Sequence, residues 1–221
     1  MNIENRNLIN ARLLERGVNI IDPTTTYIDE SVVIEDDVTI YPNTFIEGNS
    51  IIHSGAVIGV NSKLNNAVIG KNTKIESSYI INSMVGDNTT VGPMAHIREH
   101  SIIGSNVRIG NFVEMKKTVF GNRSCCAHLS YLGDCEVGEG VNIGCGVVTV
   151  NYDGKVKSKT IIGNRAFIGS NANLIAPIKI GDFAVVAAGS TVNQDVNSDD
   201  MAIARARQVN KEGYGKKYIN K

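Results

Sequence analysis

YIDESVVIEDDVTIYPNTFIEGNSIIHSGAVIGVNSKL, residues 27–64, carries an aliphatic residue at every sixth position, from Ile28 to Leu64. A helical face would recur at every third or fourth residue, and a half-buried strand would alternate at every second, so a period of six fits neither. It does fit a coil whose sides are short strands, each sending one aliphatic side chain inward before a corner. A short fixed period of this kind predicts a repeat architecture.

The period continues, with shifts, to near residue 192. Its later members are Ile69, Ile75, Ile81, Val85, Val91, Ile97, Ile103, Ile109, Met115, Val137, Ile143, Ile162, Ile168, Leu174, Ile180, Val186 and Val192. A small or β-branched residue usually stands four positions after each aliphatic one, as at Val38, Thr44 and Ala56, which suits a crowded inner corner. The one-residue slips after Leu64 and Ile81 are expected to be wider corners without chemistry.

This pattern is the hexapeptide form of a parallel β-helix, in which each coil buries its core only against its neighbours. The predicted fold class is therefore all-β. The period itself does not show the handedness of the coil.

The two ends depart from the period. Residues 4–16 predict a short helix that stops at Gly17 and must dock on something to persist. Asp200 is expected to cap a second helix through MAIARARQV, residues 201–209. We thus expect a helical arm over 1–25, the β-helix over 26–198, and a helix with a basic tail over 199–221. The basic tail could be solvated or could form a cationic edge for a phosphorylated ligand.

Composition narrows the function. The formal net charge is zero and Trp is absent, which argues against a nucleic-acid partner. No apolar run is long enough for a signal peptide or a membrane span, so a cytoplasmic location is expected. The cysteines (Cys125, Cys126, Cys135 and Cys145) do not have the spacing of a zinc site, and we expect small buried side chains on adjacent coils and no metal.

Two interruptions of the period attract attention, because loops that leave a rigid scaffold often carry function. The first covers 116–132, KKTVFGNRSCCAHLSYL. The second covers 149–161, TVNYDGKVKSKTI, which holds turn residues followed by three lysines.

These interruptions, with the coils between them, resemble one family. The strings that carry the resemblance are IGNFVEMKK (109–117), AHLSYLGD (127–134), GVNIGCGVVTVNYDG (140–154), KTIIG (159–163), FIGS (167–170), AAGSTV (187–192) and AIARARQ (202–208). They look like the acetyltransferase half of the bacterial N-acetylglucosamine-1-phosphate uridyltransferase/glucosamine-1-phosphate acetyltransferases. The resemblance implies a left-handed β-helix. The glycine-rich segment of the family's nucleotide-binding half does not occur here, so no uridyltransferase activity is expected.

The resemblance implies transfer of acetyl from acetyl-CoA to the amine of glucosamine 1-phosphate, on the way to UDP-N-acetylglucosamine. It implies His128 as general base, oriented by Glu114. The residues expected to bind the sugar phosphate are Arg98, Lys116, Tyr131, Asn142 and Lys157. Those expected to contact acetyl-CoA are Cys145, Asn151, Tyr152, Ser170, Ala188 and Arg205. The family usually has Ala where this chain has Cys145, whose backbone N–H is expected to contact the thioester oxygen. A homotrimer, with sites built from more than one chain, is also implied.

Three alternatives stay open at this point. Another hexapeptide acyltransferase could act on a different amino-sugar or hydroxyl acceptor. A carbonic-anhydrase-like metalloenzyme would need three converging histidines, and His96 and His100 lie close together in the sequence. A non-catalytic scaffold could have kept the motifs, although His128, Glu114, Lys116 and Tyr131 are all intact.

Overall fold

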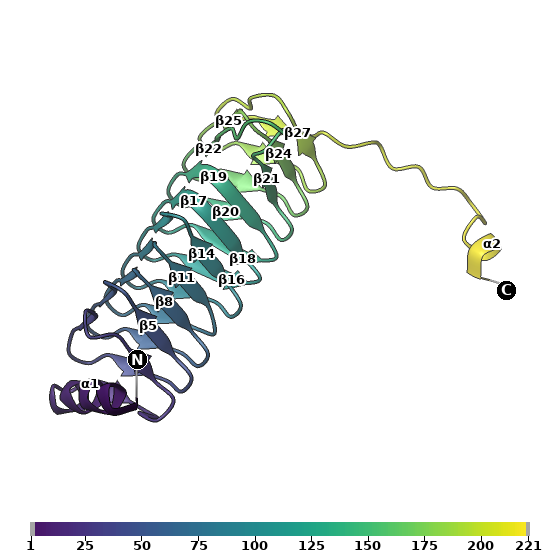
Figure 1. Cartoon of the computed structure of the whole chain (residues 1–221). Coiled ribbons are helices and arrows are strands. Elements are labelled where there is room, and N and C mark those ends of the chain that lie inside the picture. Colours follow the sequence, from purple (N-terminus) through teal and green to yellow (C-terminus); the bar gives the residue numbers. More distant parts are fainter. Residues whose placement is uncertain (1–2, 220–221) are drawn as a thin grey trace.

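A computed structural model describes residues 3–219 as a left-handed parallel β-helix with one helix packed at its N-terminal end (Figure 1). Each coil has three sides, and each side pairs in parallel with the same side of the next coil. Thr39, for example, lies beside Val57, and Val57 lies beside Lys74. The predicted fold class is confirmed.

The first side consists of strands that all belong to one continuous sheet. They are β1 (Asn19–Ile20), β4 (Thr39–Ile40), β7 (Val57–Ile58), β10 (Lys74–Ile75), β13 (Thr90–Val91), β16 (Arg108–Asn111), β18 (Cys125–His128), β20 (Asn142–Ile143), β23 (Phe167–Ile168), β26 (Val185–Val186) and β28 (Met201–Ala202).

The second and third sides form a single larger sheet, because β17 (Glu114–Phe120) and β19 (Tyr131–Val137) bend from one side to the other. The second side also contains β2 (Tyr27–Ile28), β5 (Phe45–Glu47), β8 (Lys63–Asn65), β11 (Tyr79–Ile81), β14 (His96–Arg98), β21 (Val148–Val150), β24 (Asn173–Ile175) and β27 (Thr191–Val192). The third side also contains β3 (Val33–Ile34), β6 (Ile51–Ile52), β9 (Val68–Ile69), β12 (Met84–Val85), β15 (Ile102–Ile103), β22 (Thr160–Ile162) and β25 (Ile178–Ile180).

The core is the stack of inward side chains predicted by the period. Ile28, Ile40 and Ile52 are all at most 1 % exposed, and the small corner residues such as Val38 and Thr44 are also buried. At roughly 2 kcal/mol for each buried aliphatic side chain, this stack supplies the main term that opposes the conformational entropy of the chain.

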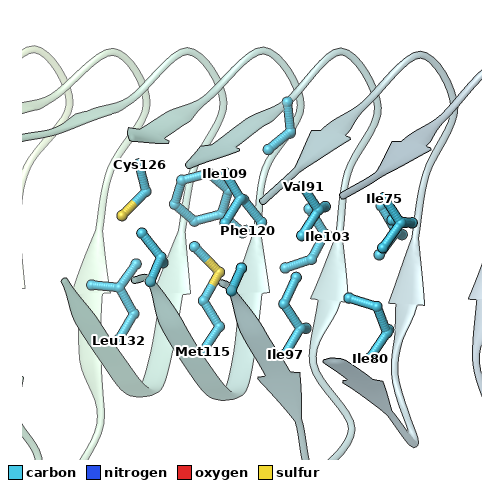
Figure 2. Close-up of a cluster of buried hydrophobic side chains, with 14 of the residues drawn as sticks. Ile75, Ile80, Val91, Ile97, Ile103, Ile109, Met115, Phe120, Cys126 and Leu132 are labelled. Atoms are coloured by element: carbon cyan, nitrogen blue, oxygen red, sulfur yellow. The ribbon is translucent and has the colours of Figure 1, made fainter. Parts of the chain in front are cut away.

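Two expectations about the period are wrong. Ile80, and not Ile81, enters the core, as Figure 2 shows for Ile80 beside Ile75 and Ile97. The slips are shorter corners and not wider ones, since the residues paired at Lys74 and Thr90 are only 16 apart, whereas a regular coil takes 18. Removing residues from a corner moves the inward position by one.

The first interruption, 116–132, does not leave the scaffold. Phe120, Cys126 and Leu132 fill the inward positions of that coil (Figure 2) and are at most 1 % exposed. The aromatic and sulfur side chains occupy the places that Ile or Val takes elsewhere. The second interruption is a true loop: Tyr152 and Lys157 form an antiparallel bridge outside the coil.

The N-terminal helix is confirmed as α1 (Ile3–Glu15), and it docks on the first coil through Ile9 and Leu13. Gly17, at φ 88°, ends the helix, a conformation that glycine adopts without strain. Asn10 is buried and donates to the carbonyls of Pro23 and Thr26 at 2.9 and 3.0 Å. The paired strands begin at Asn19, ahead of the expected boundary at residue 26.

The helix expected over 201–209 is wrong. Met201 and Ala202 instead form β28, which pairs with β26 and covers the edge of the last complete coil. The chain then runs away from the coil to a short helix, α2 (Lys216–Ile219), as Figure 1 shows. Among residues 3–219, no helix is long and apolar enough to cross a membrane.

Candidate active site

His128 lies at the last position of β18, where the first side ends and the chain turns to the second side. We call this turn the first corner. Leu129, the next residue, has φ 48°, and the ring of His128 is exposed. The ring nitrogen Nδ1 lies 2.8 Å from Oδ1 of Asn111, which holds the same position one coil earlier.

Backbone hydrogen bonds place four more residues in line with His128. Each N–H just past the corner donates to the carbonyl of the residue before the corner in the previous coil: Leu129 to Asn111, Gly146 to His128, Asn171 to Cys145 and Gly189 to Ser170. Ala188 precedes Gly189 and continues the series. Successive members are about 4.8 Å apart, the spacing of paired strands. We call Asn111, His128, Cys145, Ser170 and Ala188 the first-corner column.

The first-corner column presents unused backbone donors. Among the hydrogen bonds of residues 3–219, none has the N–H of Cys145, Ser170 or Ala188 as its donor. Gly144 and Gly169 keep the coils close here, since a Cβ on Gly169 would lie 2.4 Å from the nitrogen of Ala188. Arg205 lies near the end of the column, with its Cδ 4.0 Å from the position that a Cβ on Gly189 would take. A row of free N–H groups on one edge suits an extended polar ligand.

A second group of charged side chains lies where the second side turns to the third, which we call the second corner. Arg98 closes β14, and Lys116 is its register partner in β17. Arg98 bonds Glu114 through Nε at 2.7 Å and also pairs with Glu99. Hydrogen bonding and charge from Glu114 outweigh desolvation, so the pKa of Arg98 is raised.

Lys116 is only 5 % exposed, which is unusual for lysine, and lies 3.6 Å from Glu99 and 3.7 Å from Asp134. The amine of Lys157 lies beside it, and this proximity raises the pKa of Lys116 and lowers that of Lys157. We call Arg98, Lys116, Lys157, Glu99, Glu114 and Asp134 the cation cluster.

The loop over 151–159 brings Lys157 to this cluster. It is a small hairpin in which Ser158 donates to the carbonyl of Asn151 at 2.8 Å. The carboxylate of Asp153 accepts from the N–H groups of Val156 and Lys155, each at 2.7 Å, and these bonds lower its pKa. Asn151 anchors the base of the loop by donating to Asp134 at 2.5 Å. Tyr152 stays exposed and donates its hydroxyl to Gly154.

Tyr131 lies on the second side between the two corners, next to Glu114 in register. Its ring lies against Gly133, where a Cβ would come 2.4 Å from the hydroxyl oxygen. Gly133 therefore makes room for the tyrosine.

The structure does not bring all the expected site residues together within one chain. Glu114 bonds Arg98, and the side-chain partner of His128 is Asn111. Asn142 lies on the first side, paired with Cys125 and Phe167, apart from the cation cluster. Among residues 3–219, no three His, Cys, Asp or Glu side chains are grouped so as to hold a metal ion.

Sequence reasoning missed Asn111, Glu99 and Asp134. Asn111 stands 17 residues before His128, and this separation is one turn of the coil at this place. The coil length was therefore the signal that could have predicted their contact. Asp134 ends the quoted string AHLSYLGD but had no assigned role.

Two of the four free cysteines are packing groups, and the expectation that all four are buried is wrong for Cys125 and Cys145. Cys126 and Cys135 are buried, and burial raises the pKa of Cys126 to about 12 and that of Cys135 well above its usual range. Cys125 and Cys145 are half-buried, and Cys145 belongs to the first-corner column.

The chain resembles known proteins in sequence and in fold. Residues 25–127 match the model of the GMPPB C-terminal domain, and residues 159–194 match the bacterial transferase hexapeptide model of six repeats. The solved UDP-N-acetylglucosamine acyltransferases of Francisella novicida and Campylobacter jejuni share the fold, with TM-scores of 0.61 and 0.56 at 22 % and 20 % identity. They cover 84 % of this chain in each case, and the matched part is 66 % and 71 % of those chains.

Closer sequence relatives are curated proteins called bifunctional protein GlmU. The chain is 52 % identical to that of Clostridium acetobutylicum over 93 % of its own length and 45 % of the relative. It is 55 % identical to that of Carboxydothermus hydrogenoformans over 92 % of its length and 46 % of the relative. The chain thus spans about half the length of the curated relatives it matches.

Proposed function

The chain is a homologue of one half of the bifunctional GlmU proteins, and from this premise we propose that it transfers acetyl from acetyl-CoA to the 2-amino group of glucosamine 1-phosphate. The product would be N-acetylglucosamine 1-phosphate, a precursor of UDP-N-acetylglucosamine. Acetyl-CoA enters as a co-substrate. The cation cluster is proposed to bind the sugar phosphate, and the first-corner column is proposed to bind acetyl-CoA.

The observation that carries the acceptor assignment is the contact between Lys116 and Lys157. Two neighbouring amines cannot both hold a proton without repulsion, and the lowered pKa of Lys157 beside Lys116 reflects this. A phosphate dianion placed between them would remove the conflict by pairing with both ammonium groups. Arg98 adds a planar guanidinium, the group best matched to phosphate oxygens. Tyr131 and Asn142 are proposed to bond the sugar hydroxyls.

The first-corner column supports the acyl-donor side. An acetyl-CoA molecule laid along the column would pass Cys145, Ser170 and Ala188, whose N–H groups are free among the described residues, and reach Arg205 near its end. Asn151 and Tyr152 lie on the loop beside the cation cluster at the second corner, so we propose that they contact acetyl-CoA bound along the column of a neighbouring copy. The N–H of Cys145 is the proposed donor to the thioester oxygen, which gains negative charge as the carbonyl is attacked.

The reaction is a direct attack. The neutral amine adds to the thioester carbonyl while His128, one coil from Cys145, takes the proton that the nitrogen loses. The new C–N bond forms, the C–S bond breaks, and the proton passes to the departing thiolate to give free CoA. No covalent enzyme intermediate is needed, because the amine itself is the nucleophile.

The first-corner column and the cation cluster lie at different corners of the same coils. The second side that separates them is three residues wide in β14, or about 10 Å. One chain therefore offers the base at one edge and the phosphate-binding cations at the next. We propose a homotrimer, in which the first corner of one copy faces the second corner of another and the expected role of Glu114 toward His128 is met across the interface.

Release of free thiol from acetyl-CoA with glucosamine 1-phosphate as acceptor tests the proposal. Wild-type protein should turn over, and His128→Ala should lose activity by about a hundredfold or more, the usual range for a general base. Glucosamine, serine and other amino sugars serve as comparison acceptors. A preference for any of these over glucosamine 1-phosphate, or equal activity of the variant, would overturn the assignment.

A further inference from the structure

His128 has a side-chain partner that the proposed reaction does not yet use. Asn111 closes β16 and points its Oδ1 at Nδ1 of His128 across 2.8 Å, one coil away in strict register. Both residues belong to parallel strands of the first side, β16 and β18. Backbone pairing of these two strands fixes the distance between the two residues.

This contact determines which ring nitrogen carries the proton. The oxygen of an amide can only accept, so the nitrogen that faces it must be the donor. In the neutral imidazole one nitrogen is a donor and the other an acceptor. With the hydrogen on Nδ1, the lone pair is on Nε2, the nitrogen directed away from Asn111 and available to a substrate amine.

The choice of an amide over a carboxylate also has a consequence. An aspartate here would place a full negative charge beside the ring, whereas asparagine orients it with a neutral dipole. Glu114, the carboxylate nearest to Asn111 along the chain, is engaged by Arg98 at the next side of the coil. Among the hydrogen bonds of the described residues, Asn111 is the partner of the ring.

We propose that Asn111 is a positioning residue that holds His128 in the Nδ1–H tautomer and so presents Nε2 as the base. The inference rests on the proposed acetyl transfer for its catalytic consequence, but the tautomer itself is a property of the free protein.

The test is ¹⁵N NMR of the histidine rings in the full chain near neutral pH, with His128→Gln used to assign the His128 signals. The wild-type ring should show a protonated Nδ1 and an unprotonated Nε2. Asn111→Ala should shift the population toward Nε2–H, while Asn111→Asp, which keeps an acceptor in place, should retain the wild-type tautomer. Asn65→Ala, which removes an outward asparagine at the end of β8, is the matched control and should change nothing at His128.

Kinetics give the second readout. Asn111→Ala should lower kcat about tenfold or more with little change in the KM for acetyl-CoA, and Asn111→Asp should recover a large part of the loss. An Nε2–H tautomer in the wild type, or an unchanged tautomer in Asn111→Ala, would overturn the inference. The tautomer of the wild-type ring can be measured even if Asn111→Ala does not fold. If wild type fails to acetylate glucosamine 1-phosphate but shows the Nδ1–H tautomer, the function fails and the positioning contact stands.

Discussion

The amines of Lys116 and Lys157 lie beside each other, although both groups would ordinarily be cations. Lys116 is buried in the wall of the coil, and Lys157 is delivered by the only loop that leaves the coil among residues 116–162. The pairing raises the pKa of Lys116 and lowers that of Lys157. An anion is the natural third partner of such a pair, because it lets both amines be charged.

Removing Lys157 should weaken binding of the sugar phosphate. Lys157→Ala is expected to raise the KM for glucosamine 1-phosphate by about tenfold to a hundredfold, the range for one lost charged hydrogen bond. Steady-state kinetics with acetyl-CoA held saturating measures this. Lys155→Ala, in the same loop, is the control and should leave that KM within about twofold. Equal effects of the two substitutions on this KM would show that Lys157 has no specific role in binding the sugar phosphate.

Phosphate binding should take up a proton at alkaline pH. The pKa of Lys157 lies below that of an ordinary lysine, so between those two values the free protein holds Lys157 largely neutral. A bound phosphate favours its charged form, so the proton is taken from solvent and affinity falls as pH rises through this window. Titration calorimetry with inorganic phosphate in buffers of different ionisation heat measures the uptake. Proton uptake of the same size in Lys157→Ala would contradict the assignment.

Gly133 should be needed for the position of Tyr131 and not for folding. A methyl group there would come 2.4 Å from the hydroxyl oxygen, so Gly133→Ala must displace the tyrosine ring. We expect a higher KM for glucosamine 1-phosphate, similar to that of Tyr131→Ala, with a small change in Tm. Gly215→Ala, where a Cβ meets nothing within 4 Å, is the control. A wild-type KM in Gly133→Ala would show that the ring position is unimportant.

Cys145 should act through its backbone. Cys145→Ala keeps the N–H and removes only the thiol, so activity close to wild type is expected if the amine attacks the thioester directly. Complete loss of activity would indicate a covalent acyl-cysteine and contradict direct attack. Cys126→Ala is a useful contrast, because that thiol is buried in the core and its removal should lower the Tm.

The six-residue period was enough to predict the coil, the inward aliphatic stack and the small corner residues, because burial in a repeating coil imposes the same demand at every side. It failed where two aliphatic residues stand together: six positions from Ile75 is Ile81, but the corner is one residue shorter and Ile80 enters the core. It also failed at Phe120 and Cys126, because an aromatic ring and a thiol fill inward positions that the pattern assigns to Ile or Val.

The site was less predictable, because its contacts join different coils and different corners. Lys116, Lys157 and Arg98 were expected together and lie in one cluster. The partner of His128 could not be found by type, since a carboxylate was expected and the structure has an amide one coil away. Residues 201–209 were expected to be helical, but Met201 and Ala202 pair with the exposed edge of β26 instead.

The most direct test of the central claim is to observe the bond that the reaction forms. Acetyl-CoA labelled with ¹³C in the acetyl carbonyl and glucosamine 1-phosphate labelled with ¹⁵N in the amine are incubated with the protein and followed by NMR. The account predicts a one-bond ¹³C–¹⁵N coupling in the product, formed by wild type and at least about a hundredfold more slowly by His128→Ala. An acetyl ester on a sugar hydroxyl, or no labelled product, would contradict it.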